Sequence, residues 1–247
     1  MEDIYNWETK YVNCHYAERL LNKLTELNQQ VTQPVDIYEI RKGIYYARKY
    51  HGSQMRQSGD PYYSHPIEVA YMVAEYTALK MPQYFRTDMI LTSLLHDTIE
   101  DTTLTEDMIG RVFGKQIASQ VMDLTRVKSY GKISAAETMS ILFQQKKYDV
   151  LLIKLFDRLH NMQTIGAKSP EKIKKIVEET FKSFISVSMC YGTKQLENIL
   201  TNLCYKHLLG TEFPLEPTTI IQHKYQLPAL TFENDAKQKQ ILHLLET

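Results

Sequence analysis

Apolar residues recur three and four positions apart along most of the chain, and runs that alternate like a β-strand are nearly absent. This pattern predicts an all-α architecture, with a first helical region within residues 11–27 and a helix that contains His96 and ends at Thr102. Residues 149–163 are apolar around most of the helix circumference, which is typical of a buried central helix. The other predicted helices cover residues 36–51, 65–76, 105–113, 116–124, 134–147, 169–190 and 194–209.

Local signals mark the ends of these helices. Asp36 followed by Glu39 resembles a capping box, Gly114 closes a helix, and Pro170 suits a first helical turn. After residue 210 three prolines predict an extended arm, followed by an amphipathic helix over residues 232–245. The chain is therefore expected to comprise an N-terminal helical extension (1–35), a central helical domain (36–210) and a C-terminal arm and helix (211–247).

Composition narrows the class of protein. Lys plus Arg and Asp plus Glu both number 29, and this zero net charge argues against a bulk polyanion such as duplex DNA as partner. Three widely spaced cysteines give neither a disulfide framework nor zinc-ligand spacing. No secretion signal is visible, and no apolar run reaches the roughly 18 residues that a membrane span requires. We therefore expect a cytoplasmic protein that binds neither membranes nor bulk nucleic acid.

The stretch Leu94–Thr102 places acids and a histidine inside an apolar run. In a continuous helix, His96 and Glu100 lie on one face, as do Asp97 and Asp101, because each pair is four residues apart. Burying such groups is costly unless a metal or a partner compensates. This stretch therefore predicts a metal site with a proton-transfer group one helical turn further on.

Two more segments supply further candidate ligands. His65 stands at a predicted helix start, and Asp157 lies on the buried helix, where Lys154 and Asn161 share its polar face. Two imidazoles and two carboxylates suit Mn²⁺, Fe²⁺, Co²⁺ or Zn²⁺ rather than Ca²⁺. Water bound to such a metal has a lowered pKa and can attack phosphorus, with Glu100 or Asp101 to orient or deprotonate it.

Each candidate residue also has a plain structural interpretation. His65 could cap a helix, Asp157 could pair with Arg158, and His160 could be a packed core histidine. The basic residues within 126–132 would by default form a solvated turn. The combination of the three separated segments is what favours a metal site.

Three blocks, His51–Pro66, Leu95–Thr102 and Ile153–Met162, resemble in order and spacing the hydrolase domain of RelA/SpoT-type alarmone enzymes, part of the HD phosphohydrolase superfamily. The resemblance spans about residues 36–205. A generic HD protein would share His96 and Asp97, but not the loop around Arg56 or the third block. The resemblance implies an HD-domain helical bundle that hydrolyses ppGpp and pppGpp, the alarmones of the stringent response. The products would be pyrophosphate plus GDP or GTP, with Mn²⁺ as the usual metal.

The resemblance also implies roles for individual residues. Glu100 and Asp101 would handle the attacking water. Arg56, with Gln57 beside it, would lie against the guanine, because a guanidinium plane can stack on a base. Asn161 would hold the nucleotide near the ribose or the 3′-phosphate, while Lys154 and the 126–132 loop would meet phosphates. The implied metal ligands are His65, His96, Asp97 and Asp157.

Several positions depart from the pattern of this family. Gln57 stands where a lysine is frequent, and Ile185–Gly192 replaces a helix that usually ends Arg-Leu-Gly, so an expected arginine is missing. Too few residues follow position 205 for a synthetase domain, so we expect a hydrolase-only small form. Two alternatives stay open: an NADPH 2′-phosphatase that uses the same site, and a nucleotide-binding regulator with vestigial catalysis. The C-terminal arm suggests a lid or a dimer contact, and hence a homo-oligomer.

Overall fold

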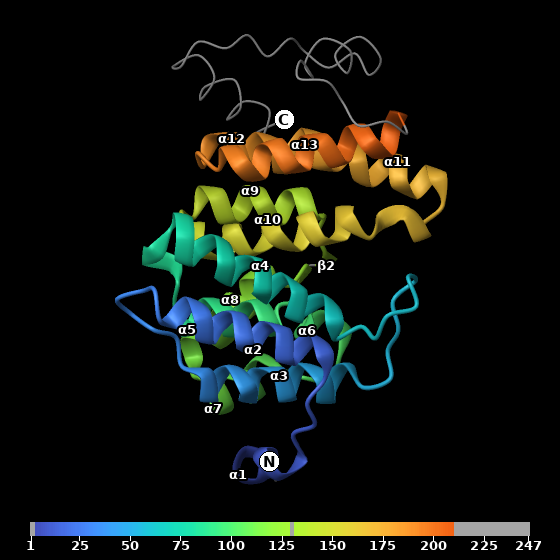
Figure 1. The fold of residues 1–247 in the computed structure, drawn as a ribbon. Helices are drawn as coiled ribbons and strands as arrows, with labels where there is room; N and C mark the ends of the chain where they lie inside the picture. The colour runs from blue at the N-terminus through green and yellow to red at the C-terminus, as the bar shows by residue number, and fades with distance from the viewer. Residues whose placement is uncertain (1–2, 129–130, 210–247) are drawn as a thin grey trace. The chain divides into compact units, whose positions relative to one another are not determined.

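The computed structural model describes residues 3–128 and 131–209, which are almost entirely helical (Figure 1). The predicted arm and helix over residues 211–247 lie outside the described residues. The chain forms two compact units, Met1–His160 and Asn161–Thr247, so that helix α10 runs from the first unit into the second. In the first unit the elements are α1 (Asp3–Lys10), α2 (His15–Asn28), α3 (Ile37–His51), α4 (Ser64–Lys80), η1 (Pro82–Tyr84), α5 (Thr87–Leu95), α6 (Thr98–Asp101), α7 (Glu106–Phe113), α8 (Lys115–Leu124), β1 (Val127–Lys128), β2 (Gly131–Lys132), α9 (Ala135–Gln144) and the start of α10 (Tyr148–Gln163).

The second unit continues from the end of α10 with short and long helical segments. The helix predicted over residues 169–190 is present as one helical run, but a π-helical segment interrupts its middle. The run packs against α13 and buries Phe184, Leu200 and Tyr205. Its elements are η2 (Ile165–Ala167), α11 (Pro170–Glu179), η3 (Thr180–Ile185), α12 (Ser186–Cys190) and α13 (Lys194–Leu209).

Asp36 and Gly114 mark helix ends where the sequence predicts them, but Asp36 and Glu39 do not form the predicted capping box, because the Asp36 N–H donates to the Thr87 hydroxyl. The Asp36 carboxylate accepts hydrogen bonds from the backbone N–H groups of Tyr38 and Glu39 and so caps α3. Gly114 ends α7 at a φ of 94°, a conformation that favours glycine because it has no Cβ. Ser134 and Glu137 form a complete capping box at the start of α9. These predicted helix boundaries are confirmed.

Three expectations need correction. The first predicted helical region corresponds to α2, and a further helix, α1, precedes it. Trp7 of α1 is buried in the core, although the periodicity did not reveal this helix. The basic segment after Arg126 is a small antiparallel hairpin, in which Val127 pairs with Lys132. The helix that contains His96 is also not continuous, because α5 ends at Leu95 and α6 begins at Thr98.

Side-chain hydrogen bonds explain this break. The ring of His96 contacts the Ser93 carbonyl through Nδ1 at 2.8 Å, and the hydroxyl of Thr98 donates to the Leu95 carbonyl at 2.7 Å. Both carbonyls would otherwise accept from the backbone N–H four residues later, as in any α-helix. Polar side chains that satisfy helix carbonyls in this way compete with the helical ladder. The break leaves His96 and Asp97 on a turn rather than on a helix face.

The core of the first unit positions this turn. Every residue from Met89 to Leu95 is buried, and α5 packs against α3, α4 and α8. Gly43 of α3 allows a close approach to α5, since a Cβ there would lie 2.6 Å from Leu91 Cδ2. The predicted burial of α10 is also confirmed, because Leu151 through Leu159 are all buried. Among the described helices, none is both long and apolar enough to cross a membrane.

Candidate metal centre and active site

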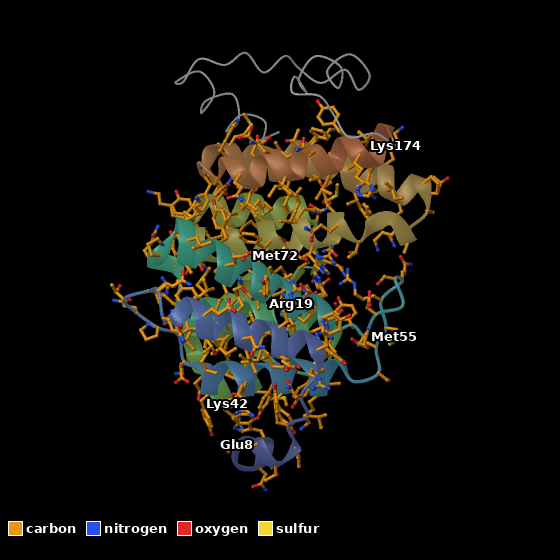
Figure 2. All side chains as sticks on the ribbon, viewed as in Figure 1. Glu8, Arg19, Lys42, Met55, Met72 and Lys174 are labelled. Carbon is orange, nitrogen blue, oxygen red and sulfur yellow. The ribbon has the colours of Figure 1, made fainter. Side chains whose placement is uncertain are left out.

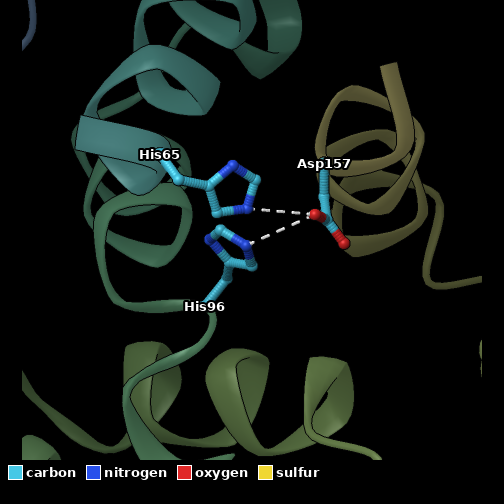
Figure 3. Close-up of side chains that lie close together, drawn as sticks. All are labelled: His65, His96 and Asp157. Carbon is cyan, nitrogen blue, oxygen red and sulfur yellow. Dashed lines mark ion pairs between the residues drawn. The ribbon is translucent and has the colours of Figure 1, made fainter. Parts of the chain in front are cut away.

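Side chains from three separate segments meet at one buried point in the first unit (Figure 3). His65 comes from the first turn of α4, His96 from the turn after α5, and Asp157 from α10. One ligand atom from each lies within 4.8 Å of the others. Figure 3 shows both imidazoles directed at the same carboxylate oxygen, Oδ1 of Asp157, at 3.2 Å from His65 Nε2 and 3.8 Å from His96 Nε2.

The fourth predicted ligand, Asp97, lies beside the same two rings. Its Oδ1 is 3.2 Å from His96 Nε2, and its Oδ2 is 3.5 Å from His65 Nε2. The structure thus brings together all four residues for which the sequence predicts metal binding. Their roles as ligands remain a prediction that the geometry supports.

The second nitrogen of each ring determines which nitrogen can bind a cation. His96 Nδ1 faces the Ser93 carbonyl and must carry a proton to donate to it, so Nε2 keeps its lone pair in the neutral ring. His65 Nδ1 lies 2.8 Å from Nδ1 of His160, so the equivalent arrangement leaves Nε2 of His65 available. Metal-binding histidines almost always use their other nitrogen in this way.

One buried atom tests whether a metal fits. His96 Nε2 is inaccessible to solvent and has no hydrogen-bond partner among the described residues, although two carboxylates lie close by. A lone pair that faces carboxylate oxygens is unfavourable unless a cation or a proton lies between them. Mixed imidazole and carboxylate donors are the set that a divalent transition metal prefers. The residues therefore fit a divalent metal site.

The electrostatics of the cluster point the same way. Burial raises the pKa of Asp97 and of Asp157, but the His96 ring beside Asp97 and the Lys154 ammonium beside Asp157 outweigh it and hold both pKa values well below the usual range. Burial lowers the pKa of His96, but the two carboxylates outweigh it and raise the pKa to about 10. The buried carboxylate of Asp157 and the half-buried carboxylate of Asp97 thus favour positive charge at this point, which a metal ion or a proton can supply.

Lys154 and His160 orient the ligands. The Lys154 ammonium lies 2.8 Å from Asp157 Oδ2, opposite the oxygen that faces the imidazoles, and the lysine is 6% exposed. His160 supports the ring of His65, and its own pKa is lowered to about 3 by burial, then by His65 and Arg56. His160 is therefore a neutral hydrogen-bonding partner rather than only a packed core residue. Its spacing of three residues from Asp157 is a signal that could have identified it.

Asp101 is connected to the metal ligands through Tyr62. The Tyr62 hydroxyl lies 2.7 Å from Asp101 Oδ2 and 3.2 Å from Asp97 Oδ2, so it can donate to either carboxylate. Gln54 donates from its side chain to the Asp101 carbonyl. The pKa of Asp101 is raised, first by burial and then by the negative charges of Asp97 and Glu100. Sequence reasoning did not identify Tyr62, although it precedes His65 by three residues in the same block.

Glu100 has different surroundings. Both of its carboxylate oxygens accept hydrogen bonds from Arg126, and Oε1 also pairs with Lys132 at 2.8 Å. Burial raises the pKa of Glu100, but the donors from Arg126 and Lys132 outweigh it and lower the pKa overall. These two residues of the basic segment are thus not merely a solvated turn.

The residues predicted to contact the nucleotide lie on two segments, the loop between α3 and α4 and the end of α10. Arg56 and Gln57 lie on the loop between α3 and α4, which closes through a hydrogen bond from the Arg56 N–H to the Asp60 carbonyl. Met55, on the same loop, is 60% exposed, and Figure 2 labels it there. Arg56 is half-buried, whereas Gln57 is exposed. Asn161 is the first residue of the second unit, one helical turn beyond Asp157 on α10.

Comparison with known proteins identifies the family of this chain. The HD domain family model matches residues 43–188. A GTP pyrophosphokinase rsh of Brucella ovis is 36% identical over 192 residues, covering 75% of this chain and 25% of that protein. A GTP pyrophosphokinase of Myxococcus xanthus is 34% identical over 190 residues, covering 72% and 24%. Since the family model covers more than half of the chain, the chain belongs to the HD domain family.

A solved structure shows the same fold. It is a metazoan orthologue of SpoT, described as hydrolysing ppGpp and as having a role in starvation responses. The superposition has a TM-score of 0.50 at 22% identity and covers 69% of this chain and 96% of that one. The chain spans about a quarter of the length of the curated relatives it matches. The pyrophosphokinase activity in their names therefore describes much longer proteins.

Proposed function

We propose that this chain is a metal-dependent hydrolase that removes the 3′-diphosphate of ppGpp and pppGpp. The observation that carries the proposal is the buried group of His65, His96 and Asp157 with the half-buried Asp97 beside it, in which His96 Nε2 has no hydrogen-bond partner among the described residues. The fold shared with a SpoT orthologue described as hydrolysing ppGpp, and the HD domain shared with the rsh proteins, support the substrate class.

The reaction is a hydrolysis at phosphorus. The oxygen of water bonds to the phosphorus attached to the ribose 3′ oxygen, and the bond between that phosphorus and the 3′ oxygen breaks. One proton of the water ends on the 3′ oxygen, and the other leaves with pyrophosphate, so that GDP or GTP is the second product. A divalent cation, when bound, lowers the pKa of a coordinated water and polarises the phosphoryl oxygens.

The residues of the chain have separable roles in this proposal. His65, His96, Asp97 and Asp157 hold the cation, for which we propose Mn²⁺. Asp101 accepts the proton of the attacking water, because its raised pKa brings it closer to neutrality, where a general base is most effective. Lys154 holds Asp157 through their ion pair, in addition to the phosphate contact that the sequence predicts.

The nucleotide contacts complete the proposal. Arg56 stacks on the guanine from its loop, with Gln57 beside it, and Asn161 contacts the ribose or the 3′-phosphate. The loop that carries Arg56 is closed by the hydrogen bond from the Arg56 N–H to the Asp60 carbonyl, and it leads into the helix that begins with Ser64 and His65, which supports this assignment. Gln57 is uncharged, whereas the lysine frequent at this position in the family would carry a positive charge beside the guanine. We therefore expect weaker selectivity for guanine over other bases.

The test is a substrate and metal panel with the purified full chain. With Mn²⁺ the protein should release pyrophosphate from ppGpp and pppGpp. Asp97→Ala should lower kcat/KM by at least about a hundredfold, since it removes a ligand of the ion that activates water. Asp107→Ala is the matched control, because Asp107 pairs only at the surface with Arg111 and should leave the rate unchanged.

Each other outcome of the panel has a distinct meaning. No pyrophosphate release with any of Mn²⁺, Fe²⁺, Co²⁺ or Zn²⁺ would overturn the proposal. A higher kcat/KM for NADPH, with release of inorganic phosphate, would make the protein a 2′-phosphatase. Tight binding of ppGpp without turnover would make it a nucleotide-binding regulator.

A further inference from the structure

His51 is a buried titratable residue that the proposed mechanism does not use. It is the last residue of α3, just before the Gly52 that ends the helix, and it is 1% exposed. Its Nδ1 lies 2.9 Å from Oε1 of Gln54, and its Nε2 has no hydrogen-bond partner among the described residues. A buried lone pair without a donor costs stability, and an apolar side chain would avoid that cost. Packing alone therefore does not explain a histidine at this position.

The side-chain amide of Gln54 determines which tautomer His51 adopts. Gln54 donates from Nε2 to the Asp101 carbonyl at 2.8 Å, so its other atom, Oε1, is the acceptor that faces His51. His51 Nδ1 must therefore carry the proton, and Nε2 keeps its lone pair. Burial lowers the pKa of His51 more than the hydrogen bond with Gln54 raises it, which favours the neutral ring.

The carbonyl of Asp101 needs the donor that Gln54 supplies. Asp101 is the last residue of α6, and the carbonyls of the last turn have no acceptor role within their own helix. A helix of four residues is also too short to be stable by itself, so contacts from other segments must hold it. Gln54 is fixed for this contact, because its N–H donates to the His51 carbonyl and its carbonyl accepts from the Tyr62 N–H.

The ring of His51 reaches the same acid by a second route. It stacks on the ring of Tyr62, with centroids 4.6 Å apart and an interplanar angle of 26°. The Tyr62 hydroxyl has one proton, and it lies closer to Asp101 Oδ2, at 2.7 Å, than to Asp97 Oδ2, at 3.2 Å. Within the part of the chain that the structure describes, Oδ1 of Asp101 accepts no hydrogen bond. That oxygen is left to accept a proton from water.

We propose that His51 is a positioning residue that anchors Asp101 at two points, at its carbonyl through Gln54 and at its carboxylate through Tyr62. The inference rests on the proposed function, in which Asp101 is the base. A base must lie within hydrogen-bonding reach of the proton that it removes, and a displacement of about 1 Å costs on the order of a hundredfold in rate. Loss of either contact should therefore lower kcat more than it raises KM.

The first test observes the tautomer of His51 without measuring activity. In ¹⁵N–¹H NMR spectra of the full chain with ¹⁵N-labelled histidine, the His51 signals are those that disappear in His51→Phe. They should show a proton on Nδ1 and none on Nε2. In Gln54→Leu the Nδ1 proton loses its acceptor, so its signal should move to higher field. A proton on Nε2, or an Nδ1 signal that does not move in Gln54→Leu, would overturn the proposal.

The second test compares kcat for ppGpp with affinity for Mn²⁺. Tyr62→Phe keeps the ring that stacks on His51 and removes the hydroxyl. It should lower kcat about 10- to 100-fold, the effect of losing a hydrogen bond to a charged group, while KM and the Kd for Mn²⁺ stay within about threefold of the wild-type values. Tyr50→Phe is the matched control, because the Tyr50 ring stacks on Tyr46 away from Asp101. A wild-type kcat in Tyr62→Phe, or a loss of Mn²⁺ affinity as large as the loss of kcat, would contradict an action on Asp101.

The contact through Gln54 has its own pair of variants. His51→Phe retains a ring against Tyr62 but cannot donate to Gln54, and Gln54→Leu, at an exposed position, cannot donate to Asp101. Each should lower kcat about three- to tenfold, as expected for one neutral hydrogen bond. The double variant should be no slower than the slower single variant, because the two residues act in series. Additive losses would show that His51 does not act through Gln54.

The two proposals fail in different ways. If the NMR spectra show the expected tautomer and its response to Gln54→Leu, but the wild type hydrolyses neither alarmone, the proposed function is wrong and the anchoring of Asp101 stands. If the wild type hydrolyses ppGpp while Tyr62→Phe and Gln54→Leu keep its kcat, the function stands and the positioning role of His51 is wrong. Melting temperatures establish that each variant is folded.

Discussion

At the scale of single residues, the site shows how a partner decides the role of a titratable group. Glu100 and Asp101 are neighbours in sequence and equivalent in chemistry. Asp101 meets one hydroxyl, that of Tyr62, and its pKa is raised by burial. Glu100 meets a guanidinium and an ammonium, and its pKa is lowered despite burial. Residue type alone could not separate these two acids.

His160 provides a prediction at the same scale. Its replacement by alanine should weaken binding of Mn²⁺ by about 10- to 100-fold, because the ring of His65 loses the partner that orients it. A competition titration with a chelator of known affinity measures this change. His15→Ala is the control, since His15 is exposed at the start of α2. Equal metal affinities in the wild type and His160→Ala would show that His65 is held by its packing alone.

At the scale of elements, the interruption between α5 and α6 positions the metal ligands His96 and Asp97, which lie in neither helix. Its cause is local, because the side chains of His96 and Thr98 satisfy carbonyls that would otherwise continue the helix. Its consequence is that Asp97 and His96 can both approach the same centre. Asp101 remains helical as the last residue of α6, and its N–H donates to the Asp97 carbonyl.

Thr98→Val tests this interpretation of the break. Valine keeps the volume of threonine but leaves the buried Leu95 carbonyl without the hydroxyl donor, which should destabilise the protein by about 1–3 kcal/mol. Urea unfolding measures the change, and Mn²⁺ affinity should fall with it. The matched control is Thr103→Val, at an exposed position of the following segment. A Thr98→Val protein with wild-type stability and metal affinity would mean that the turn is maintained by tertiary packing instead.

At the scale of the whole molecule, the metal centre joins segments that are distant in the sequence. His65, His96 and Asp157 belong to α4, to the turn after α5 and to α10, so an ion that binds all three can bind only the folded first unit. Removal of the ion also takes its positive charge away from the carboxylates of Asp97 and Asp157, which both face His65 Nε2. Metal binding and stability should therefore be linked.

Chelation measures that linkage. Mn²⁺ at about a hundred times its Kd should stabilise the folded protein by about 2.7 kcal/mol, and EDTA should remove this gain and lower the Tm. Differential scanning calorimetry with Mn²⁺ and with EDTA detects the shift. Asp97→Ala, whose site is incomplete, should show a much smaller one. Identical melting curves for the wild type in the two buffers would contradict an integrated metal centre.

The sequence by itself determined the helical class, most helix boundaries and the four candidate ligands. It could do so because helical periodicity, the cap at Asp36, and the apolar surroundings of His96 and Asp157 are local features. It missed α1 and the break at His96, since both depend on competition between local hydrogen bonds and packing. Only the tertiary structure decided which residues support the ligands. These supporting contacts are His160 with His65, Tyr62 with Asp97 and Asp101, and two basic side chains with Glu100. The residues in each contact are 26 to 95 positions apart in the sequence, so only the folded chain brings them together.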